Sequence, residues 1–214
     1  MSAEGVTLIL ASASPRRREL LARLGLTVSV VHSAVAEAPS PSETPREHVR
    51  RLALLKARTV AAQNPQQPVL AADTVVVLGA RVLGKPRDRE QAAAMVRDLA
   101  GNTHEVLTGV ALCWEGREVV HTEAAEVTFT PYDRALYSWY VATGEGDDKA
   151  GAYAIQGRGA LLVDRVLGNV QAVIGLPLAP LPRLFAAVGL RLEADGGCLS
   201  LTRAPFEQRF SLRS

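Results

Sequence analysis

The stretch Val69-Leu70-Ala71-Ala72-Asp73-Thr74-Val75-Val76-Val77-Leu78 is the strongest strand signal in the chain. Apolar residues occupy both faces of this run, as in a strand buried inside a sheet. Asp73 interrupts the run, although Asp is depleted in strands and almost never buried without a partner. We therefore expect Asp73 to be a metal ligand, a general base or the partner of a buried cation; a structural cap of a neighbouring loop is the alternative.

A capped helix is expected before this strand. The sequence Thr44-Pro45-Arg46-Glu47 has the form of a capping box and predicts a long helix. Lys56 lies seven residues after Val49, so helical periodicity places both on the same apolar side. A buried ammonium group is costly unless it is paired, and Asp73 is a candidate partner. The alternative is that Lys56 extends to solvent at the edge of the apolar stripe.

Apolar runs alternate with helical patterns along the rest of the chain, which predicts an α/β fold. Further strands are expected at residues 6–11, 26–31, 81–83, 103–114, 118–129, 160–166 and 170–174. Helices are expected at residues 15–24, from 45 onward, and at 88–99, 131–142 and 176–188. The 214 residues suit one domain or two fused lobes.

Composition excludes several classes of protein. With 48% hydrophobic and 21% charged residues the chain is globular and not disordered. The net charge is only +2, and no basic run exceeds Arg16-Arg17-Arg18, so we expect no nucleic-acid partner. Nothing approaches the ~20 apolar residues of a membrane helix, so we expect no membrane association. The two Cys form no CxxC motif, and a cytoplasmic location is expected.

Lysine is rare in this chain. Of the 24 Lys and Arg residues only three are lysines, namely Lys56, Lys85 and Lys149. Lys85 lies in Gly84-Lys85-Pro86 directly after a predicted hairpin, and Pro86 favours an extended backbone at Lys85. A lysine presented in this way could reach a phosphate as a point charge. The alternative is a solvated turn lysine.

Two further segments are candidates for binding a nucleotide. Ser12, Ser14 and Arg16 lie where a strand leads into a helix, and helix N-termini and Arg side chains favour a polyanion. The alternative is a surface Arg cluster with ordinary capping. The Gly-rich loop 144–159 joins acidic residues to Lys149 and Gln156, and the Gln amide suits reading a base edge. An ordinary polar loop is the alternative here.

Taken in order, these segments resemble the Maf family, also called septum-formation inhibitor proteins. The matching pieces are Leu8-Ile9-Leu10-Ala11-Ser12-Ala13-Ser14-Pro15-Arg16-Arg17, Ala72-Asp73-Thr74, Gly84-Lys85-Pro86, Asp148-Lys149-Ala150-Gly151-Ala152-Tyr153, Ile155-Gln156-Gly157 and Gly175-Leu176-Pro177. The resemblance covers about residues 6 to 188. Ala154 departs from it, because the family commonly has Gly there, and the aromatic residue often found shortly before Gly-Leu-Pro is lacking.

The resemblance implies a nucleoside triphosphate pyrophosphatase that cuts dTTP and UTP into nucleoside monophosphate and pyrophosphate, with a divalent cation, Mg²⁺ or Mn²⁺. It implies a twisted mixed β-sheet with flanking helices in two lobes around a deep cleft, and a homodimer. On this basis residues 1–190 form one domain, and 191–214 are a C-terminal appendix of unknown role. The family's older name also links it to the arrest of cell division.

The resemblance also implies roles for single residues. Asp73 matches the proposed proton acceptor, and the positions tied to pyrimidine specificity are Arg16, Thr74 and Gln156. Ser12, Ser14, Lys56, Lys85 and Lys149 are expected to bind the substrate. The carboxylates expected to hold the metal are Asp73, Glu37 and Asp148. Two alternatives stay open: a non-catalytic cell-division regulator that acts by protein binding, and a pyrophosphatase with another base preference such as 7-methyl-GTP.

Overall fold

The computed structural model describes residues 5–38, 40 and 42–204. The strands are β1 (Leu8–Leu10), β2 (Val28–Val30), β3 (Val69–Leu78), β4 (Arg81–Leu83), β5 (Thr103–Trp114), β6 (Arg117–Phe129), β7 (Val163–Gly168), β8 (Leu190–Asp195) and β9 (Cys198–Arg203). The helices are α1 (Pro15–Arg23), α2 (Pro45–Ala61), α3 (Arg89–Leu99), α4 (Arg134–Ala142), α5 (Val170–Ile174) and α6 (Leu181–Ala187), with two 3₁₀ helices, η1 (Ala150–Ala152) and η2 (Gly157–Leu162). No helix in the described ranges has the length and hydropathy needed to cross a membrane.

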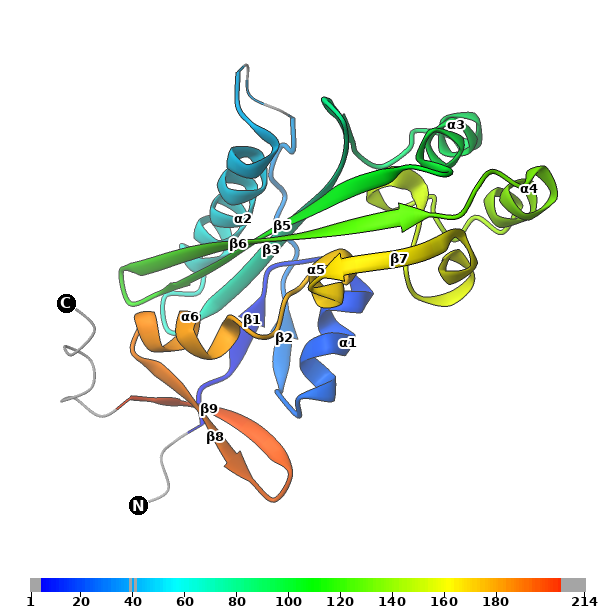
Figure 1. The fold of residues 1–214 in the computed structure, drawn as a ribbon. Helices are drawn as coiled ribbons and strands as arrows, with labels where there is room; N and C mark the ends of the chain where they lie inside the picture. The colour runs from blue at the N-terminus through cyan, green and yellow to red at the C-terminus, as the bar shows by residue number, and fades with distance from the viewer. Residues whose placement is uncertain (1–4, 39, 41, 205–214) are drawn as a thin grey trace. The chain divides into compact units, whose positions relative to one another are not determined.

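Seven strands form one mixed sheet (Figure 1). Its order is β2-β1-β3-β5-β6-β7, and β4 pairs with β3. β1 runs parallel to both β2 and β3, whereas the β3–β4 and β6–β7 pairs are antiparallel. Parallel neighbours need a crossover connection, and α1 and α2 lie in the connections from β1 to β2 and from β2 to β3. The α/β fold expected from the alternating sequence pattern is confirmed.

The chain divides into two compact units. Unit 1 comprises residues 1–73, 109–122 and 176–214, and unit 2 comprises residues 74–108 and 123–175. Each unit has an apolar core of its own, one around Ile9, Ala53 and Val69 and the other around Phe129 and Leu162. The division passes through β3 between Asp73 and Thr74, so these neighbouring residues belong to different units.

The α2 helix packs closely on β5 within unit 1. The capping box predicted at its start is present, since the Thr44 hydroxyl accepts from the Glu47 N–H at 3.2 Å and the Glu47 carboxylate accepts from the Thr44 N–H at 2.8 Å. A Cβ added at Gly109 on β5 would lie 2.3 Å from the carbonyl oxygen of Val49 on α2. Glycine therefore lets the backbones of α2 and β5 approach closely.

The prediction of a strand at residues 170–174 is wrong, because this segment is helix α5. The Asn169 side chain accepts from the N–H of Gln171 at 2.9 Å and so caps the helix start. Gly175 ends the helix with a φ of 115° in the left-handed region. Five residues are too few for apolar periodicity to separate strand from helix, and the cap and the glycine decide it.

Other predicted boundaries also need correction; for example, the strands expected at 6–11 and 26–31 are Leu8–Leu10 and Val28–Val30. The strand expected at 160–166 begins only at Val163, because η2 extends to Leu162. The helix expected at 131–142 begins at Arg134, where the Asp133 side chain caps it by accepting from the Leu136 N–H at 2.9 Å. The helix expected at 176–188 is shorter, Leu181–Ala187, since Pro180 serves as its N-cap.

The segment after Leu190 forms an antiparallel hairpin, β8–β9, that belongs to unit 1. The Leu201 carbonyl accepts from the Val6 N–H at 2.7 Å, and the Leu24 carbonyl accepts from the Leu199 N–H at 3.3 Å. The Arg203 guanidinium lies 4.6 Å from the ring centre of Trp114. The proposed domain boundary at residue 190 stays a prediction, and residues 205–214 lie outside the described part.

Candidate functional site

Lys56 is buried in unit 1 between two carboxylates. Its Nζ donates to Oδ1 of Asp73 at 2.7 Å and lies 2.6 Å from Oε1 of Glu37. The side chains of Lys56 and Asp73 are only 9% and 10% exposed, whereas that of Glu37 is 49% exposed. The prediction that Asp73 is tied to Lys56 is thus confirmed, and Glu37 gives this buried pair a side that faces solvent.

The start of α1 adds cations to the same group. Ser12 is buried after β1, and its Oγ accepts from Nη1 of Arg17 at 3.0 Å and from the N–H of Ser14 at 3.2 Å. Ser14 is the N-cap residue, as expected, but its side chain makes no capping hydrogen bond. Burial lowers the pKa of Arg17, while the charges of Asp73 and Glu37 act in the opposite direction.

The positive and negative side chains of this group do not balance in charge. Arg16, Arg17 and Lys56 carry three positive charges against the two negative charges of Asp73 and Glu37, and Arg16 and Arg17 are close enough for each charge to affect the other. Two adjacent guanidinium groups at a helix N-terminus repel each other and oppose the helix dipole, so a bound anion would relieve both costs. This part of unit 1 is therefore suited to phosphate.

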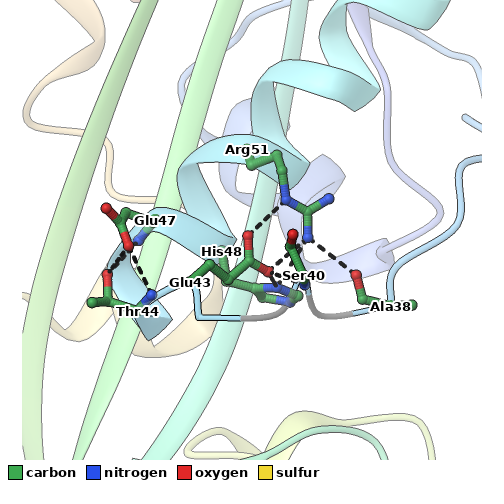
Figure 2. A network of polar contacts seen from close by, with 7 residues as sticks. All are labelled: Ala38, Ser40, Glu43, Thr44, Glu47, His48 and Arg51. Carbon is green, nitrogen blue, oxygen red and sulfur yellow. Dashed lines mark hydrogen bonds and ion pairs between the residues drawn. The ribbon is translucent and has the colours of Figure 1, made fainter.

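A second polar network holds the loop that carries Glu37 (Figure 2). Arg51 on α2 donates from Nε and Nη2 to the two carboxylate oxygens of Glu43, each at 2.7 Å, and from Nη2 to the Ala38 carbonyl at 3.1 Å. The hydrogen bonds from Arg51 hold the pKa of Glu43 well below its usual range. Because Ala38 directly follows Glu37, Arg51 fixes the backbone beside the carboxylate that contacts Lys56.

In unit 2 the structure places Thr74 and Lys85 in different surroundings. The Thr74 hydroxyl lies 2.9 Å from the Thr108 hydroxyl, which donates to the carbonyl oxygen of Ala172 at 2.7 Å. Lys85 is exposed in the turn after β4. The carbonyl of the preceding Gly84 accepts from the Gly151 N–H at 3.0 Å, so this turn contacts the Gly-rich loop of the same unit.

The Gly-rich loop carries three of the predicted residues. Lys149 donates from Nζ to Oδ1 of the exposed Asp148 and to the backbone carbonyl of Glu145, each at 2.5 Å. Gln156 is half-buried and stands at the start of η2. The loop thus presents a lysine, a carboxylate and an amide within one unit, a set of groups that suits a nucleotide.

The carboxylates predicted to hold a metal suit a site in which the protein supplies only one or two ligands. Within the described ranges, no group of three or more His, Cys, Asp or Glu side chains could hold a metal ion. Asp73 and Glu37 converge on one point, the Lys56 ammonium, whereas Asp148 belongs to unit 2. Two hard oxygen donors do fit Mg²⁺, which proteins commonly bind through one or two carboxylates together with substrate phosphates and water.

Both Arg16 and Arg17 belong to the predicted cationic helix start, but only Arg16 was assigned a role, whereas the Arg17 side chain makes the contact with Ser12. Helical spacing could have identified it, since Leu20 and Leu21 follow Arg17 by three and four residues and are both buried. The Arg51–Glu43 contact was also missed, because residues eight apart on a loop and a helix share no local pattern.

The sequence of this chain is similar to a known protein family and to several named proteins. The family model described as "Maf-like protein" matches residues 7–188. A protein of Myxococcus xanthus (strain DK1622) named dTTP/UTP pyrophosphatase is 50% identical over 90% of this chain and 97% of its own. Proteins with the same name from Symbiobacterium thermophilum and Escherichia coli O157:H7 are 46% and 48% identical, over 88% and 80% of this chain and 97% and 88% of theirs.

Similarity to solved structures is weaker. A HAM1 protein from Coxiella burnetii aligns with a TM-score of 0.42 at 17% identity, over 60% of this chain and 75% of that chain.

Proposed function

The chain belongs to the Maf-like protein family, and from this premise we propose that it is a nucleoside triphosphate pyrophosphatase with dTTP and UTP as preferred substrates. The names of the relatives support this substrate class. The observation that carries the proposal is the buried Lys56 ammonium held between Asp73 and Glu37, beside the cationic start of α1. A carboxylate that can act as general base and a cationic surface that binds phosphate both promote phosphoanhydride hydrolysis.

In the proposed reaction a water molecule attacks the α-phosphorus. The bond from the water oxygen to this phosphorus forms as the bond from the phosphorus to the α–β bridging oxygen breaks, and pyrophosphate leaves. The water proton passes to Asp73 as general base. Lys56 holds Oδ1 of Asp73 in place at 2.7 Å, and we assign the water to the other oxygen, Oδ2.

Charge neutralisation is divided among several groups. Arg16, Ser12 and Ser14 are assigned to phosphate at the start of α1, because a helix N-terminus favours an anion. Lys85 and Lys149 are each assigned to phosphate as point charges. Asp73 and Glu37 would hold Mg²⁺ or Mn²⁺, with Asp148 as a third candidate. When bound, such a cation masks phosphate charge in the transition state. Thr74 and Gln156 are assigned to the base, since both can donate and accept hydrogen bonds.

Product analysis tests the reaction. The protein is incubated with dTTP, UTP, CTP, GTP and 7-methyl-GTP and Mg²⁺ in ¹⁸O-water, and products are identified by mass spectrometry. We expect monophosphate and pyrophosphate, fastest from dTTP and UTP, with ¹⁸O in the monophosphate. Orthophosphate and a nucleoside diphosphate would mean that a different bond is cut. Preference for 7-methyl-GTP would overturn the base assignment, and no turnover by the folded protein would favour a non-catalytic regulator.

Variants test the role of Asp73. Asp73→Asn should remove nearly all turnover of dTTP while the protein stays folded, because the amide cannot take the water proton. Asp98→Asn is the matched control, since Asp98 is an ion-paired but solvent-exposed carboxylate on α3, 2.8 Å from Arg81. Turnover at the wild-type rate by a folded Asp73→Asn protein would exclude Asp73 as the base.

A further inference from the structure

Glu145 connects the two ends of the Gly-rich loop in unit 2. Its carboxylate accepts from the backbone N–H of Gly159 at 2.9 Å through Oε1 and from that of Arg158 at 3.1 Å through Oε2. Its backbone carbonyl accepts from Nζ of Lys149 at 2.5 Å. One residue therefore contacts both the lysine that follows it and the turn that begins more than ten residues later.

The local backbone is shaped to admit this carboxylate. Gly157 has a φ of +76°, and a Cβ added there would lie 3.0 Å from Oε2 of Glu145. A Cβ at Gly159 would lie 2.1 Å from the carbonyl oxygen of Ala154. Side chains at these two positions would therefore displace the carboxylate or the loop itself, and glycine avoids both.

The turn that Glu145 holds is the one that begins at Gln156. Gln156 is the N-cap residue of η2, with an extended backbone at φ −92° and ψ 152°, and it directly precedes Gly157. A carboxylate that accepts two adjacent N–H groups makes charge-assisted hydrogen bonds and fixes the direction of the chain before them. The Glu145 carboxylate therefore contacts the backbone just after Gln156, whereas the Glu145 carbonyl contacts Lys149.

We propose that Glu145 is a positioning residue for base selection, which acts by fixing the backbone that carries Gln156. This inference rests on the proposed function, because it assumes that Gln156 contacts the base. The proposal assigns separate effects to the side-chain carboxylate and to the backbone carbonyl of Glu145. Loss of the carboxylate should affect the choice of base, and the Lys149 contact with the carbonyl should persist, since every side chain at position 145 retains that carbonyl.

The experiment measures kcat/KM for dTTP and for GTP in four proteins: wild type, Glu145→Gln, Glu145→Ala and the control Glu126→Gln. Glu126 is an exposed glutamate on β6 of the same unit. The ratio of the two kcat/KM values is independent of the fraction of active protein, so partial unfolding leaves it unchanged.

We expect the dTTP-to-GTP ratio of kcat/KM to fall about 10- to 100-fold in Glu145→Ala, as for other small displacements of a positioned group. Glu145→Gln, which keeps one acceptor oxygen, should lie between Glu145→Ala and wild type.

Lys149→Met gives the complementary result. It should raise KM for dTTP and GTP by similar factors and leave the ratio close to the wild-type value, because it removes a charge and not a base contact. Amide hydrogen exchange adds a readout independent of activity: exchange at Arg158 and Gly159 should be faster in Glu145→Ala than in Glu126→Gln, because both amides lose their acceptor.

Two outcomes would overturn the proposal. One is an unchanged dTTP-to-GTP ratio in Glu145→Ala, whether the rates for both nucleotides fall or stay the same. The other is unchanged exchange at the two amides. Failure of the proposed function itself is recognised separately, since wild-type protein would then give no monophosphate and pyrophosphate from any nucleotide.

Discussion

Replacing Lys56 by Met tests how the buried cation supports unit 1. Met keeps most of the side-chain volume, so the change removes the charge and its hydrogen bonds rather than the packing. Asp73, whose side chain is 10% exposed, then loses the ammonium at 2.7 Å. Breaking a buried ion pair by removing one partner costs about 3–5 kcal/mol of unfolding free energy. We expect a loss in this range for Lys56→Met.

The reverse substitution should be milder. In Asp73→Asn the ammonium keeps Glu37 at 2.6 Å, and Glu37 is half exposed, so the loss should be about 1–3 kcal/mol. The double variant Lys56→Met/Asp73→Asn leaves neither charge buried. Its loss should therefore be smaller than the sum of the two single losses by about 0.5–3 kcal/mol, which is the coupling free energy of the pair.

Urea unfolding followed by circular dichroism measures these values, provided that the dependence of free energy on urea, the m-value, is unchanged. For a chain of this size the loss in Lys56→Met corresponds to a Tm lower by about 6–20 °C. Arg50→Met is the matched control, because Arg50 is an exposed cation on the same helix. An unfolding free energy of Lys56→Met within about 1 kcal/mol of the Arg50→Met control, or a coupling free energy near zero, would show that the buried ion pair does not stabilise unit 1.

Three further predictions concern residues outside this group. Burial lowers the pKa of His104 from its ordinary 6.5 to about 4, so the unfolded chain binds a proton at this residue before the folded chain does as pH falls. Protonation of His104 should therefore lower the free energy of unfolding by about 3 kcal/mol from pH 6.5 to 4. In His104→Gln the urea concentration at the unfolding midpoint should change less with pH across that range. Gly109→Ala should lose at least 1–3 kcal/mol by overpacking, whereas Gly84→Ala, with open space at its Cβ position, should lose less than 1 kcal/mol in the same urea assay. Burial raises the pKa of Cys113 to about 11, so a thiol reagent at pH 8 should label the exposed Cys198 quickly and Cys113 only after unfolding; equal labelling rates in the native protein would contradict this burial.

Much of the fold could be predicted from local sequence. The capping box at Thr44, the helical pattern of residues 88–99 and the run from Val69 to Leu78 all act through neighbours a few residues away, and each predicted element is present. The prediction failed at residues 170–174, where five apolar and amide-bearing residues span little more than one helical turn. Over so short a segment a period of 2 and a period of 3.6 cannot be separated.

Local sequence pattern likewise identified some residues of the candidate site and not others. Lys56 within an apolar stripe and Asp73 within an apolar strand were recognisable because each breaks the pattern of its own element. Arg51 and Glu145 break no such pattern, since an arginine on a polar helix face and a glutamate in a polar loop are ordinary residues. Their importance comes from the backbone groups that they contact, beside Glu37 and beside Gln156.

Local sequence pattern was enough to predict that a cation and a carboxylate lie in apolar surroundings and need partners. Only the packing of the folded chain shows that they pair with each other and that Glu37 also contacts the cation. Periodicity says only which way a side chain faces on its own helix or strand, whereas an ion pair depends on the distance between two elements. Lys56 on α2 and Asp73 on β3 come within 2.7 Å only because the helix packs beside the strand.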